Sequence, residues 1–479
     1  MAHTGKMLAE FAEERGLSIN RFAKEVNGDK GFVSSIFKGD KPLTEKILQA
    51  TLVKKLLLPE QAERLREAFY REVYGEEAYA RLLCIQRGLK RLAEAETVPP
   101  PAIPKQYMDY TPQNGLEIIT NRAALCAAVC FILQNELQQS EKPQIITNYP
   151  FAAAEIDDIA YHFLRKHQDK AVDFRHYVMF ECAAKMTLNM DNIFGTLRYF
   201  RLRHNLHGYP AEKEPFIPIN VVYPHYFVTS GHVLLFHAEQ HHGLLLADVE
   251  LAQTLAFQVA QQHPQYFPLA QFPKDEMELK QVFTQKIQFS SASGELSFWP
   301  CLGPYCDKAM YCEVFHQDIP ARAALIDSVD QLYHDALRSD PNAPLYHTVQ
   351  GFKQFAQTGR FQELSQRFVR PAPSAIRAEL LRRVAVAVKN GTNLRLLDEK
   401  FVPLPQGLAI ELFGTFGFVT GSISPDDAGF MGEFIKIVDR PATVQDFADF
   451  LDYIDRNAFY YPADWTVNFL EKLAAEIDP

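Results

Sequence analysis

Residues 17–39 constrain the fold of this 479-residue chain more than any other segment, because they predict two short helices joined by a tight turn. Ser18 is a good N-cap for the first helix, and Asp29 is a good N-cap for the second. Between the helices, Asn27 and Gly28 tolerate positive φ and permit a sharp turn. Each helix has an apolar face, formed by Phe22, Ala23 and Val26 in the first and by Phe32, Val33 and Ile36 in the second. The segment therefore predicts a helix-turn-helix.

The second of these helices keeps polar residues for its outer face: Lys30, Ser34, Ser35 and Lys38. A short helix with such a face suits the major groove of DNA. The local charge agrees, since residues 1–55 hold ten Lys or Arg against seven Asp or Glu, a net of +3. The whole chain has 49 Lys or Arg against 59 Asp or Glu, a net of −10, so the remainder carries −13. That long acidic remainder is not expected to wrap DNA.

The same segment resembles the DNA-binding domains of the phage lambda-repressor and Cro class, the Xre-type regulators. The resemblance is carried by residues at the family's spacing: Leu17-Ser18, Phe22-Ala23, Val26, Val33-Ser34, Ile36 and Gly39. Residues 8–15 look like the family's first helix, and residues 43–56 look like a later one. The resemblance covers only the N-terminal part of the chain.

This resemblance implies sequence-specific binding to double-stranded DNA by a homodimer that reads two half-sites. Lys30, Gly31 and Ser35 fall where the family reads base edges. Because glycine has no side chain, we expect Lys30 and Ser35 to read bases, and Ser34 and Lys38 to contact phosphates. Ser18 completes the expected DNA-binding set.

Two positions depart from the family pattern. Asn27 stands where the family commonly has glycine, although Asn can still adopt the left-handed conformation. Phe37 stands where the family usually has glutamate, so a polar contact is lost. A plain helical bundle that uses the same fold for packing or protein contact is the alternative interpretation.

A proline-rich segment, residues 97–104, follows the helical N-terminal part. Its four prolines in six residues remove amide donors and disfavour helix, which predicts an interdomain linker. The length of the chain also requires more than one domain. The expected parts are a helix-turn-helix domain over 1–75, a helix and linker over 76–105, and an α+β sensing or oligomerisation region over 106–479, with two possible subdomains at about 106–370 and 371–479.

Beyond the linker, helical and strand patterns alternate. Periodicity predicts helices at 121–138, 153–167, 248–262, 321–338 and 374–388, with two more from residue 444 onward. Strand patterns occur at 144–147, 226–229, 233–237, 394–397, 408–413, 416–420 and 434–438. The predicted fold class is α+β, with an all-α N-terminal domain followed by a mixed α+β region that contains antiparallel strands.

Two segments, 218–246 and 403–420, share an outline in which prolines lead into short apolar strands. One shared outline falls short of the several periods that establish a repeat, so an internal duplication stays open. The glycines between residues 414 and 421 fit neither the dinucleotide fingerprint nor the phosphate loop, and a hairpin accounts for them better.

One cysteine spacing could serve a metal. Three thiols and an imidazole within sixteen residues can make a tetrahedral zinc site: Cys301, Cys306, Cys312 and His316. The usual pair of ligands two residues apart is absent, and the neighbouring aromatic residues suit a packed core, so no metal or cofactor is expected. Cys126 and Cys130, in an alanine-rich apolar helix, are also expected in the core.

Five histidines cluster around the hairpin predicted near residue 230, where strand alternation could form a metal site or a pH-responsive patch: His225, His232, His237, His241 and His242. A basic and aromatic stretch at 197–204 could face an anionic ligand, or could be an exposed element with snorkelling side chains. The chain has no phosphate-loop lysine, zinc-protease, nucleophile-elbow or kinase motif, so an enzyme is not expected.

These patterns predict a transcriptional regulator that stays in the cytoplasm, because the chain shows no secretory signal and no apolar run long enough for a membrane helix. Its C-terminal region is expected to sense a small molecule or peptide, or to bind a partner. A scaffold protein whose helix-turn-helix does not bind DNA is the alternative. An enzyme fused to a DNA-binding head is a third hypothesis.

Overall fold

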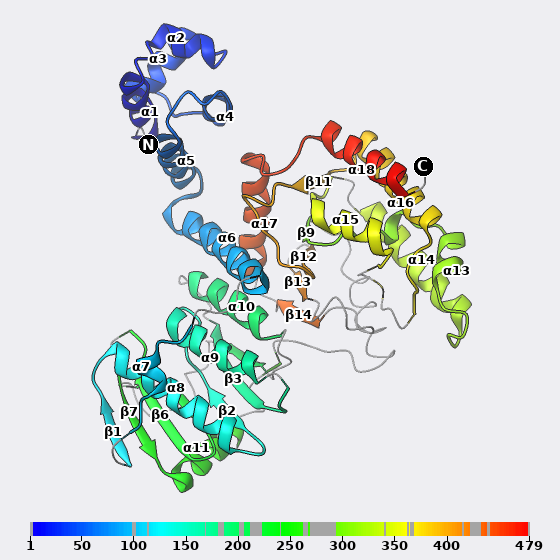
Figure 1. Cartoon of the computed structure of the whole chain (residues 1–479). Coiled ribbons are helices and arrows are strands. Elements are labelled where there is room, and N and C mark those ends of the chain that lie inside the picture. Colours follow the sequence, from blue (N-terminus) through cyan, green and yellow to red (C-terminus); the bar gives the residue numbers. More distant parts are fainter. Residues whose placement is uncertain are drawn as a thin grey trace. The chain divides into compact units, whose positions relative to one another are not determined.

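The computed structural model divides into two compact units, Met1–Leu83 with Asp452–Ala458, and Cys84–Leu451 with Phe459–Pro479 (Figure 1). The structure describes residues 3–97, 102–112, 115–167, 169–180, 186–200, 206–210, 223–239, 241–261, 267–268, 294–339, 342–361, 364, 368–413, 416–421, 433–437 and 441–477.

The described part of the first unit is all-helical. Its elements are α1 (His3–Glu14), α2 (Ile19–Glu25), α3 (Lys30–Lys38), α4 (Glu45–Val53), α5 (Pro59–Tyr74), the start of α6 (Glu76–Thr97) and the end of α17 (Pro441–Arg456). Its core gathers apolar residues at helical spacing, among them Leu8, Phe11, Phe22, Val26, Ile47 and Leu48. The prediction of an all-α N-terminal part is confirmed, because the 3.6-residue period places these side chains on inward faces.

The two units divide inside α6, between Leu83 and Cys84, whereas the sequence suggested an end at residue 75 and a linker up to residue 105. The helix continues across this point because its buried residues Leu82, Ile85 and Leu89 keep the helical period. Residues 98–101, with three of the linker prolines, lie outside the described residues. The first unit also takes in Asp452–Ala458, which no local pattern could indicate.

The second unit contains two mixed β-sheets. The first sheet has the strand order β1-β7-β6-β5-β2-β3-β4-β8. Its strands are β1 (Leu116–Ile119), β2 (Gln144–Thr147), β3 (Asp173–Phe180), β4 (Leu206–Pro210), β5 (His225–Val228), β6 (His232–His237), β7 (His242–Ala247) and β8 (Phe267–Pro268). The helices of this part are α7 (Lys105–Met108), α8 (Arg122–Gln139), α9 (Ala154–Lys166), α10 (Met186–Phe200) and α11 (Val249–Gln261).

The second sheet has the strand order β11-β10-β9-β12-β13-β14. Its strands are β9 (Gly294–Ser297), β10 (Leu345–Thr348), β11 (Leu394–Leu397), β12 (Leu408–Phe413), β13 (Phe416–Gly421) and β14 (Glu433–Ile437). The helices are η2 (Gly303–Tyr305), α13 (Lys308–Val314), α14 (Arg322–Ser339), α15 (Val349–Thr358), α16 (Ser374–Lys389), α17 and α18 (Ala463–Ile477). With both sheets mixed, the predicted α+β class is confirmed.

The predicted elements are present, and β2, β11 and β12 have the predicted bounds. Several other elements were not predicted: α10, α13 and α15 among the helices, and β1, β3, β4, β7, β9 and β10 among the strands. α10 was not predicted because its residues 192–199 are buried on every side, so the sequence lacks an amphipathic pattern there. Most of the missed strands have only four to six residues, too few for a clear alternation.

Six strands of each sheet follow one topology, whereas β1, which pairs with β7, has no counterpart among the strands described for the second sheet. In the first, β2, β3 and β4 are parallel, and β5, β6 and β7 extend from β2 as antiparallel neighbours. In the second, β9, β10 and β11 are parallel, and β12, β13 and β14 extend from β9 in the same way. Beyond β4, Pro268 pairs with His207, and beyond β11, Tyr460 forms the matching antiparallel bridge with Leu397. The outline shared by 218–246 and 403–420 therefore falls on matching strands.

The correspondence extends to a pair of buried histidines. His176 of β3 lies opposite Thr147 of β2, and His347 of β10 lies opposite Ser297 of β9. Each imidazole bonds to the main chain of the aromatic residue two positions after that partner. His176 Nε2 lies 2.7 Å from the carbonyl oxygen of Tyr149, and His347 is bonded to the main chain of Trp299.

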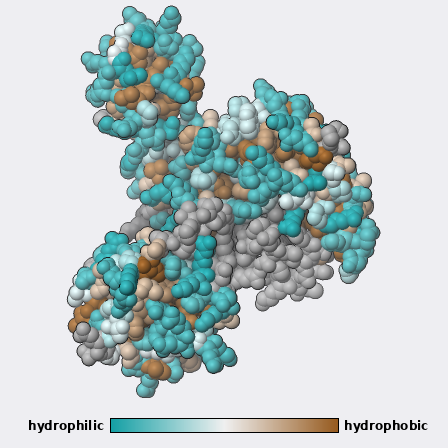
Figure 2. All heavy atoms as spheres, viewed as in Figure 1, coloured by the Kyte–Doolittle hydropathy of each residue, from teal (hydrophilic) through white to brown (hydrophobic). Residues whose placement is uncertain are grey.

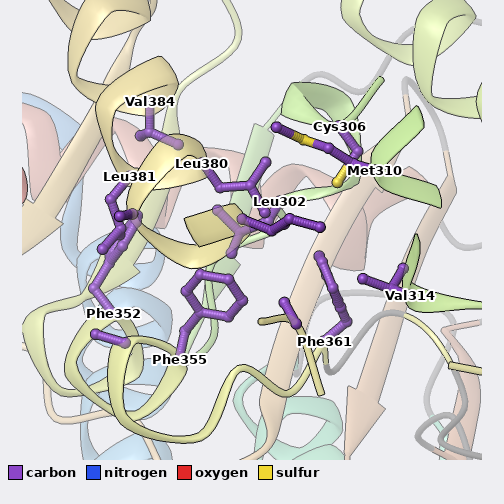
Figure 3. Close-up of a cluster of buried hydrophobic side chains, with 14 of the residues drawn as sticks. Leu302, Cys306, Met310, Val314, Phe352, Phe355, Phe361, Leu380, Leu381 and Val384 are labelled. Atoms are coloured by element: carbon purple, nitrogen blue, oxygen red, sulfur yellow. The ribbon is translucent and has the colours of Figure 1, made fainter. Parts of the chain in front are cut away.

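Helices α11 and α17 also correspond, because α11 follows β7, α17 follows the matching strand β14, and each packs on the matching face. α11 packs on the face that carries Ile146 of β2. α17 packs on the face that carries Gly294 of β9, where a side-chain carbon added to the glycine would lie 2.4 Å from Leu451 Cδ1. The helices on the other face of the second sheet enclose a large apolar core, in which Phe355 of α15 and Leu380 of α16 lie close to Leu302 (Figure 3).

A buried ionic cluster joins α6, α9 and α10. The Asp157 carboxylate is fully buried and accepts hydrogen bonds from Arg91, Arg198 and Tyr199 at 2.9, 3.0 and 2.8 Å. The Tyr149 hydroxyl donates to the same carboxylate at 3.1 Å. Both arginines also bond to Asp158, which is partly exposed, at 2.8 and 2.7 Å. A buried charge with this many partners holds these elements in one arrangement.

We expect Asp157→Ala to lower the free energy of unfolding of the second unit by about 3–5 kcal/mol, because it removes the buried acceptor shared by two arginines and two tyrosine hydroxyls. Asp158→Ala, at the solvent edge of the same cluster, should cost about 1 kcal/mol or less. Urea unfolding followed by circular dichroism measures both values. Equal losses for the two variants would contradict the role given to burial.

The paired histidines predict a pH dependence. Burial lowers the pKa of His176 to about 3 and the pKa of His347 to about 4. In the unfolded chain both titrate near 6.5, so the unfolded state binds more protons and stability falls as the pH drops from about 6.5 towards 4. Each histidine contributes a slope of about 1.4 kcal/mol per pH unit.

Urea midpoints measured between pH 7 and pH 5 should therefore depend less on pH in His176→Gln and in His347→Gln. The matched control is His334→Gln, since His334 has a 58% exposed side chain. If His334→Gln reduced the pH dependence of the urea midpoint as much as the two buried variants do, the buried histidines would not be its cause.

Candidate nucleic-acid interface

Side-chain caps at the start of α2 and α3 define the helix-turn-helix. The Ser18 oxygen accepts a hydrogen bond from the Arg21 amide at 3.4 Å, and Asp29 Oδ1 accepts one from the Phe32 amide at 2.8 Å. Each cap satisfies an amide that the first helical turn leaves without a partner. α3 ends at Gly39, whose φ of 81° is left-handed. The predicted N-caps at Ser18 and Asp29 are therefore confirmed.

The turn between the two helices depends on Asn27. Its φ of 51° lies in the left-handed region, which Asn adopts more readily than most residues. The departure from the glycine of the resembled family is therefore accommodated. Gly28 follows Asn27 and leaves little room for a side chain, since an added side-chain carbon would lie 3.2 Å from Val33 Cγ2.

The inner face of α3 is anchored by Val33 and Ile36, both fully buried. α1 packs on α3 with a close backbone approach at Gly5, where an added side-chain carbon would lie 2.3 Å from the Ile36 carbonyl oxygen. Sequence reasoning missed this contact, although a glycine inside a helical pattern is a usable signal of close packing. The anchored inner face determines which residues α3 presents outward.

The predicted DNA-binding residues of α3 lie away from the buried face. Lys30 and Lys38 are exposed, and Ser34 and Ser35 are half-buried. The Ser35 hydroxyl donates to the Gly31 carbonyl at 3.0 Å, so its oxygen is left to accept hydrogen bonds. Ser18 lies at the start of α2 and caps it, and its hydroxyl hydrogen is still available to a phosphate. The small residues Gly31, Ser34 and Ser35 make this outer face shallow.

Phe37 is half-buried and packs against Phe22 in the first unit. Its ring lies 5.2 Å from the Phe22 ring, centroid to centroid, at an interplanar angle of 55°. Phe37, at the position where the resembled family has glutamate, therefore adds packing between α2 and α3. Such ring pairs contribute about 0.5–1.5 kcal/mol beyond their buried area.

One cation beside α3 was missed by sequence reasoning. The Lys41 ammonium lies 4.9 Å from the centre of the Phe32 ring, and the Lys41 side chain is exposed. The signal was available, because Lys41 follows α3 within the same basic segment. It adds a third exposed lysine to Lys30 and Lys38.

The surface of the first unit is mostly hydrophilic on the side that Figure 2 shows, with hydrophobic residues between. Its exposed large apolar side chains are Ile19, Val53, Leu58 and Val73. Two of the three arginines of α5 have acidic partners, with Arg66 2.8 Å from Glu63 and Arg71 2.7 Å from Glu67, and Arg64 lies over the Phe11 ring at 5.5 Å. This pairing reduces the positive charge that α5 offers to a phosphate chain.

The cysteine spacing noted above does not assemble a metal centre. Cys306 is 5% exposed within the apolar core, whereas Cys312 is exposed on α13. Among the residues that the structure describes, no three His, Cys, Asp or Glu side chains are placed to hold a metal ion, so Cys301 and His316 complete no ligand set. Cys126 and Cys130 are buried in α8, where burial raises the pKa of both thiols to about 12.

The clustered histidines spread along the hairpin. The rings of His237 and His242 lie 5.9 Å apart at one end, and His232 lies at the other end, opposite Ala247. His225 is on β5, where burial lowers its pKa to about 4. In the basic stretch at 197–204, Arg198 forms an ion pair with Asp157. Residues 201–204 lie outside the described residues.

Neither a protein-family model nor a curated protein matches this chain. In the described portion of the chain, every helix is too short or too polar to cross a lipid bilayer. We therefore infer function from the geometry of the helix-turn-helix and from the residues that it exposes.

We expect Phe37→Glu to destabilise the first unit by about 1–3 kcal/mol, because it removes the ring contact with Phe22 and places a carboxylate between α2 and α3. Phe37→Leu keeps an apolar side chain and should cost less. Hydrogen exchange of the α2 and α3 amides in the full chain measures both effects. An unchanged exchange rate in Phe37→Glu would show that the contact contributes nothing.

Proposed function

We propose that this protein is a sequence-specific DNA-binding transcriptional regulator of the Xre type, with α3 as its recognition helix. The observation that supports this most is that α3 has one buried apolar face and one exposed polar face. Its inner face is fixed by Val33 and Ile36, and its outer face offers Lys30, Ser34, Ser35 and Lys38 to a ligand. A helix fixed on one side and polar on the other suits insertion into the major groove.

Each exposed residue has a chemical role in this proposal. Lys30, as a cation, donates to the acceptor edge of guanine. Ser35 accepts from a base amino group, because its own hydrogen is bonded to Gly31. Ser34, Lys38 and Ser18 contact phosphates, which position the helix without reading sequence. The absence of a side chain at Gly31 lets the helix backbone approach the groove floor.

The protein is proposed to act in the cytoplasm as a homodimer, since modules of this type read two half-sites about 34 Å apart. The second unit, with its two sheets, is proposed to sense a small molecule or peptide, or to bind a partner. Its share of the acidic charge reduces non-specific attraction to DNA.

A second candidate function is a protein-interaction scaffold whose helix-turn-helix does not bind DNA. The exposed apolar residues of the first unit favour it, above all Val53 at 76% and Leu58 at 48% exposed. Such side chains serve protein contacts better than contacts to a phosphate backbone.

We expect Lys30→Ala and Lys38→Ala to weaken binding to duplexes that the full chain selects from a random library. Lys30→Ala should cost about 1–3 kcal/mol and relax preference at one position of the site. Lys38→Ala should weaken all sequences alike and lower the slope of log K against log salt by about 0.9. Fluorescence anisotropy across a salt series measures both effects.

The matched control is Lys142→Ala, which removes the same charge from an exposed residue of the second unit. This control should leave affinity and salt slope unchanged. A shallow salt slope that neither α3 variant alters would reject the regulator and favour the scaffold.

A further inference from the structure

The first unit is built from two pieces of the chain that lie far apart in sequence. It combines Met1–Leu83 with Asp452–Ala458, which is the end of α17 and the two residues that follow it. Side-chain bonds join the two pieces across 378 positions, from Tyr74 to Asp452, and across 407 positions, from Gln49 to Arg456. The unit is therefore complete only when both pieces are present.

Tyr453 brings the far segment into the interior of the first unit. Its side chain is 3% exposed, and its ring packs edge-on against Tyr70, Tyr74 and Tyr79, with centroids 5.2, 6.3 and 6.2 Å apart. Edge-to-face rings at these distances attract one another beyond the area that they bury. Because Tyr70 and Tyr79 are themselves buried, a smaller side chain at position 453 would leave a cavity beside them.

Polar contacts fix the same segment to α4 and α5. The Gln49 side-chain amide of α4 donates to the Arg456 carbonyl at 2.7 Å, which satisfies an acceptor at the C-terminal end of α17. The Arg456 guanidinium lies 3.4 Å from the Glu45 carboxylate, at the start of α4. The Tyr74 hydroxyl of α5 donates to Asp452 at 2.8 Å. The far segment thus joins α4 to α5, in addition to their own connection in the chain.

α5 in turn supports the helix-turn-helix through α1. The Glu72 carboxylate of α5 accepts hydrogen bonds from the Thr4 hydroxyl at 2.7 Å and from the Thr4 amide at 3.2 Å. Near the start of α5, the Gln61 side chain donates to Glu14 of α1 at 2.5 Å. α1 packs on α3 at Gly5. The side of the unit that binds the far segment and the side that carries α3 are therefore connected by α5 and α1.

We propose that Asp452–Ala458 is an integral part of the DNA-binding unit, in which Tyr453 and Arg456 hold α4 and α5 in the arrangement that DNA binding by α3 requires. This inference rests on the proposed DNA-binding function. Tyr453 and Arg456 are positioning residues, since the residues proposed to contact DNA lie between Ser18 and Lys38. A chain that stops before residue 452 lacks part of its DNA-binding unit, although every proposed DNA contact is present.

The test is hydrogen exchange of the full chain in Tyr453→Ala. Exchange of the α4 and α5 amides should accelerate about a hundredfold, because the variant removes the shared ring contact and leaves a cavity. Amides of β9, β10 and β12 in the second sheet should keep their rates, because the Tyr453 ring packs within the first unit. Tyr453→Phe keeps the ring and should bring the exchange back to within about fivefold of the wild-type rate.

A milder variant on the other piece of the unit keeps the test decisive if Tyr453→Ala does not fold. Gln49→Ala removes the donor to the Arg456 carbonyl and should accelerate exchange of the α4 amides about fivefold. The matched control is Gln445→Ala, which changes an exposed glutamine of α17 in the second unit, where its side chain donates to Asp449 at 2.8 Å. The control should leave exchange of α4 and α5 unchanged.

Two outcomes of the exchange experiment would overturn the proposal. One is unchanged exchange of α4 and α5 in both Tyr453→Ala and Gln49→Ala, since the first unit would then hold together without the far segment. The other is a uniform acceleration over both units in Tyr453→Ala, which would mean a loss of general stability.

Binding to the selected duplex gives a separate readout. Tyr453→Ala should weaken binding at least about tenfold without changing the slope of log K against log salt, because it removes no phosphate contact. Tyr453→Phe should restore the affinity, and Gln445→Ala should not change it. If the wild-type chain selects no duplex, the proposed function fails, while the exchange experiment still decides whether the far segment completes the unit. If Tyr453→Ala loses protection in α4 and α5 but binds as tightly as the wild type, the link to DNA is rejected even though the regulator function stands.

Discussion

The buried carboxylate of Asp157 is the constraint on which the arrangement of the first sheet and its helices depends. An ionised carboxylate without solvent is tolerable only when several donors surround it, and here they come from α6, α10 and the segment that follows β2. Residues 192–199 of α10 are buried on every side, and the close packing around them requires glycine at Gly88 of α6 and at Gly195. A side-chain carbon at Gly88 would overlap the Phe194 ring, and one at Gly195 would overlap the Phe151 ring. Ionic pairing and close packing thus select the same arrangement.

The repeated topology was only partly visible in the sequence. Thr147-Asn148-Tyr149-Pro150 and Ser297-Phe298-Trp299-Pro300 share a hydroxyl residue, an aromatic residue and a proline at the same spacing, and each precedes a strand with a buried histidine. Sequence reasoning noticed the later strands of both copies and left a duplication open. The copies lack a fixed period, because one connection contains α9 alone and the other contains η2, α13 and α14. Only strand pairing in three dimensions aligns them.

The proposed DNA interface was more predictable than the rest of the molecule, because nearly all of its determinants are local. Caps at Ser18 and Asp29, the left-handed Asn27 and the buried faces of α2 and α3 depend on residues within one or two turns. The contacts that sequence reasoning missed join residues far apart in the sequence, such as Gly5 of α1 and Ile36 of α3. The attachment of Asp452–Ala458 is the extreme case, since neither composition nor periodicity relates residue 49 to residue 456.

The comparison between α11 and α17 explains how such an attachment can arise in a repeated fold. α11 follows β7, α17 follows the matching strand β14, and both cover the matching face, so the fold requires only their inward residues. The outward side of α11 carries Val249 and Phe257, which are 56% and 63% exposed. In α17 the residues beyond Leu451 are instead Asp452, Tyr453 and Arg456, which bond and pack within the first unit. The second copy can therefore change the end of this helix without losing its own sheet packing.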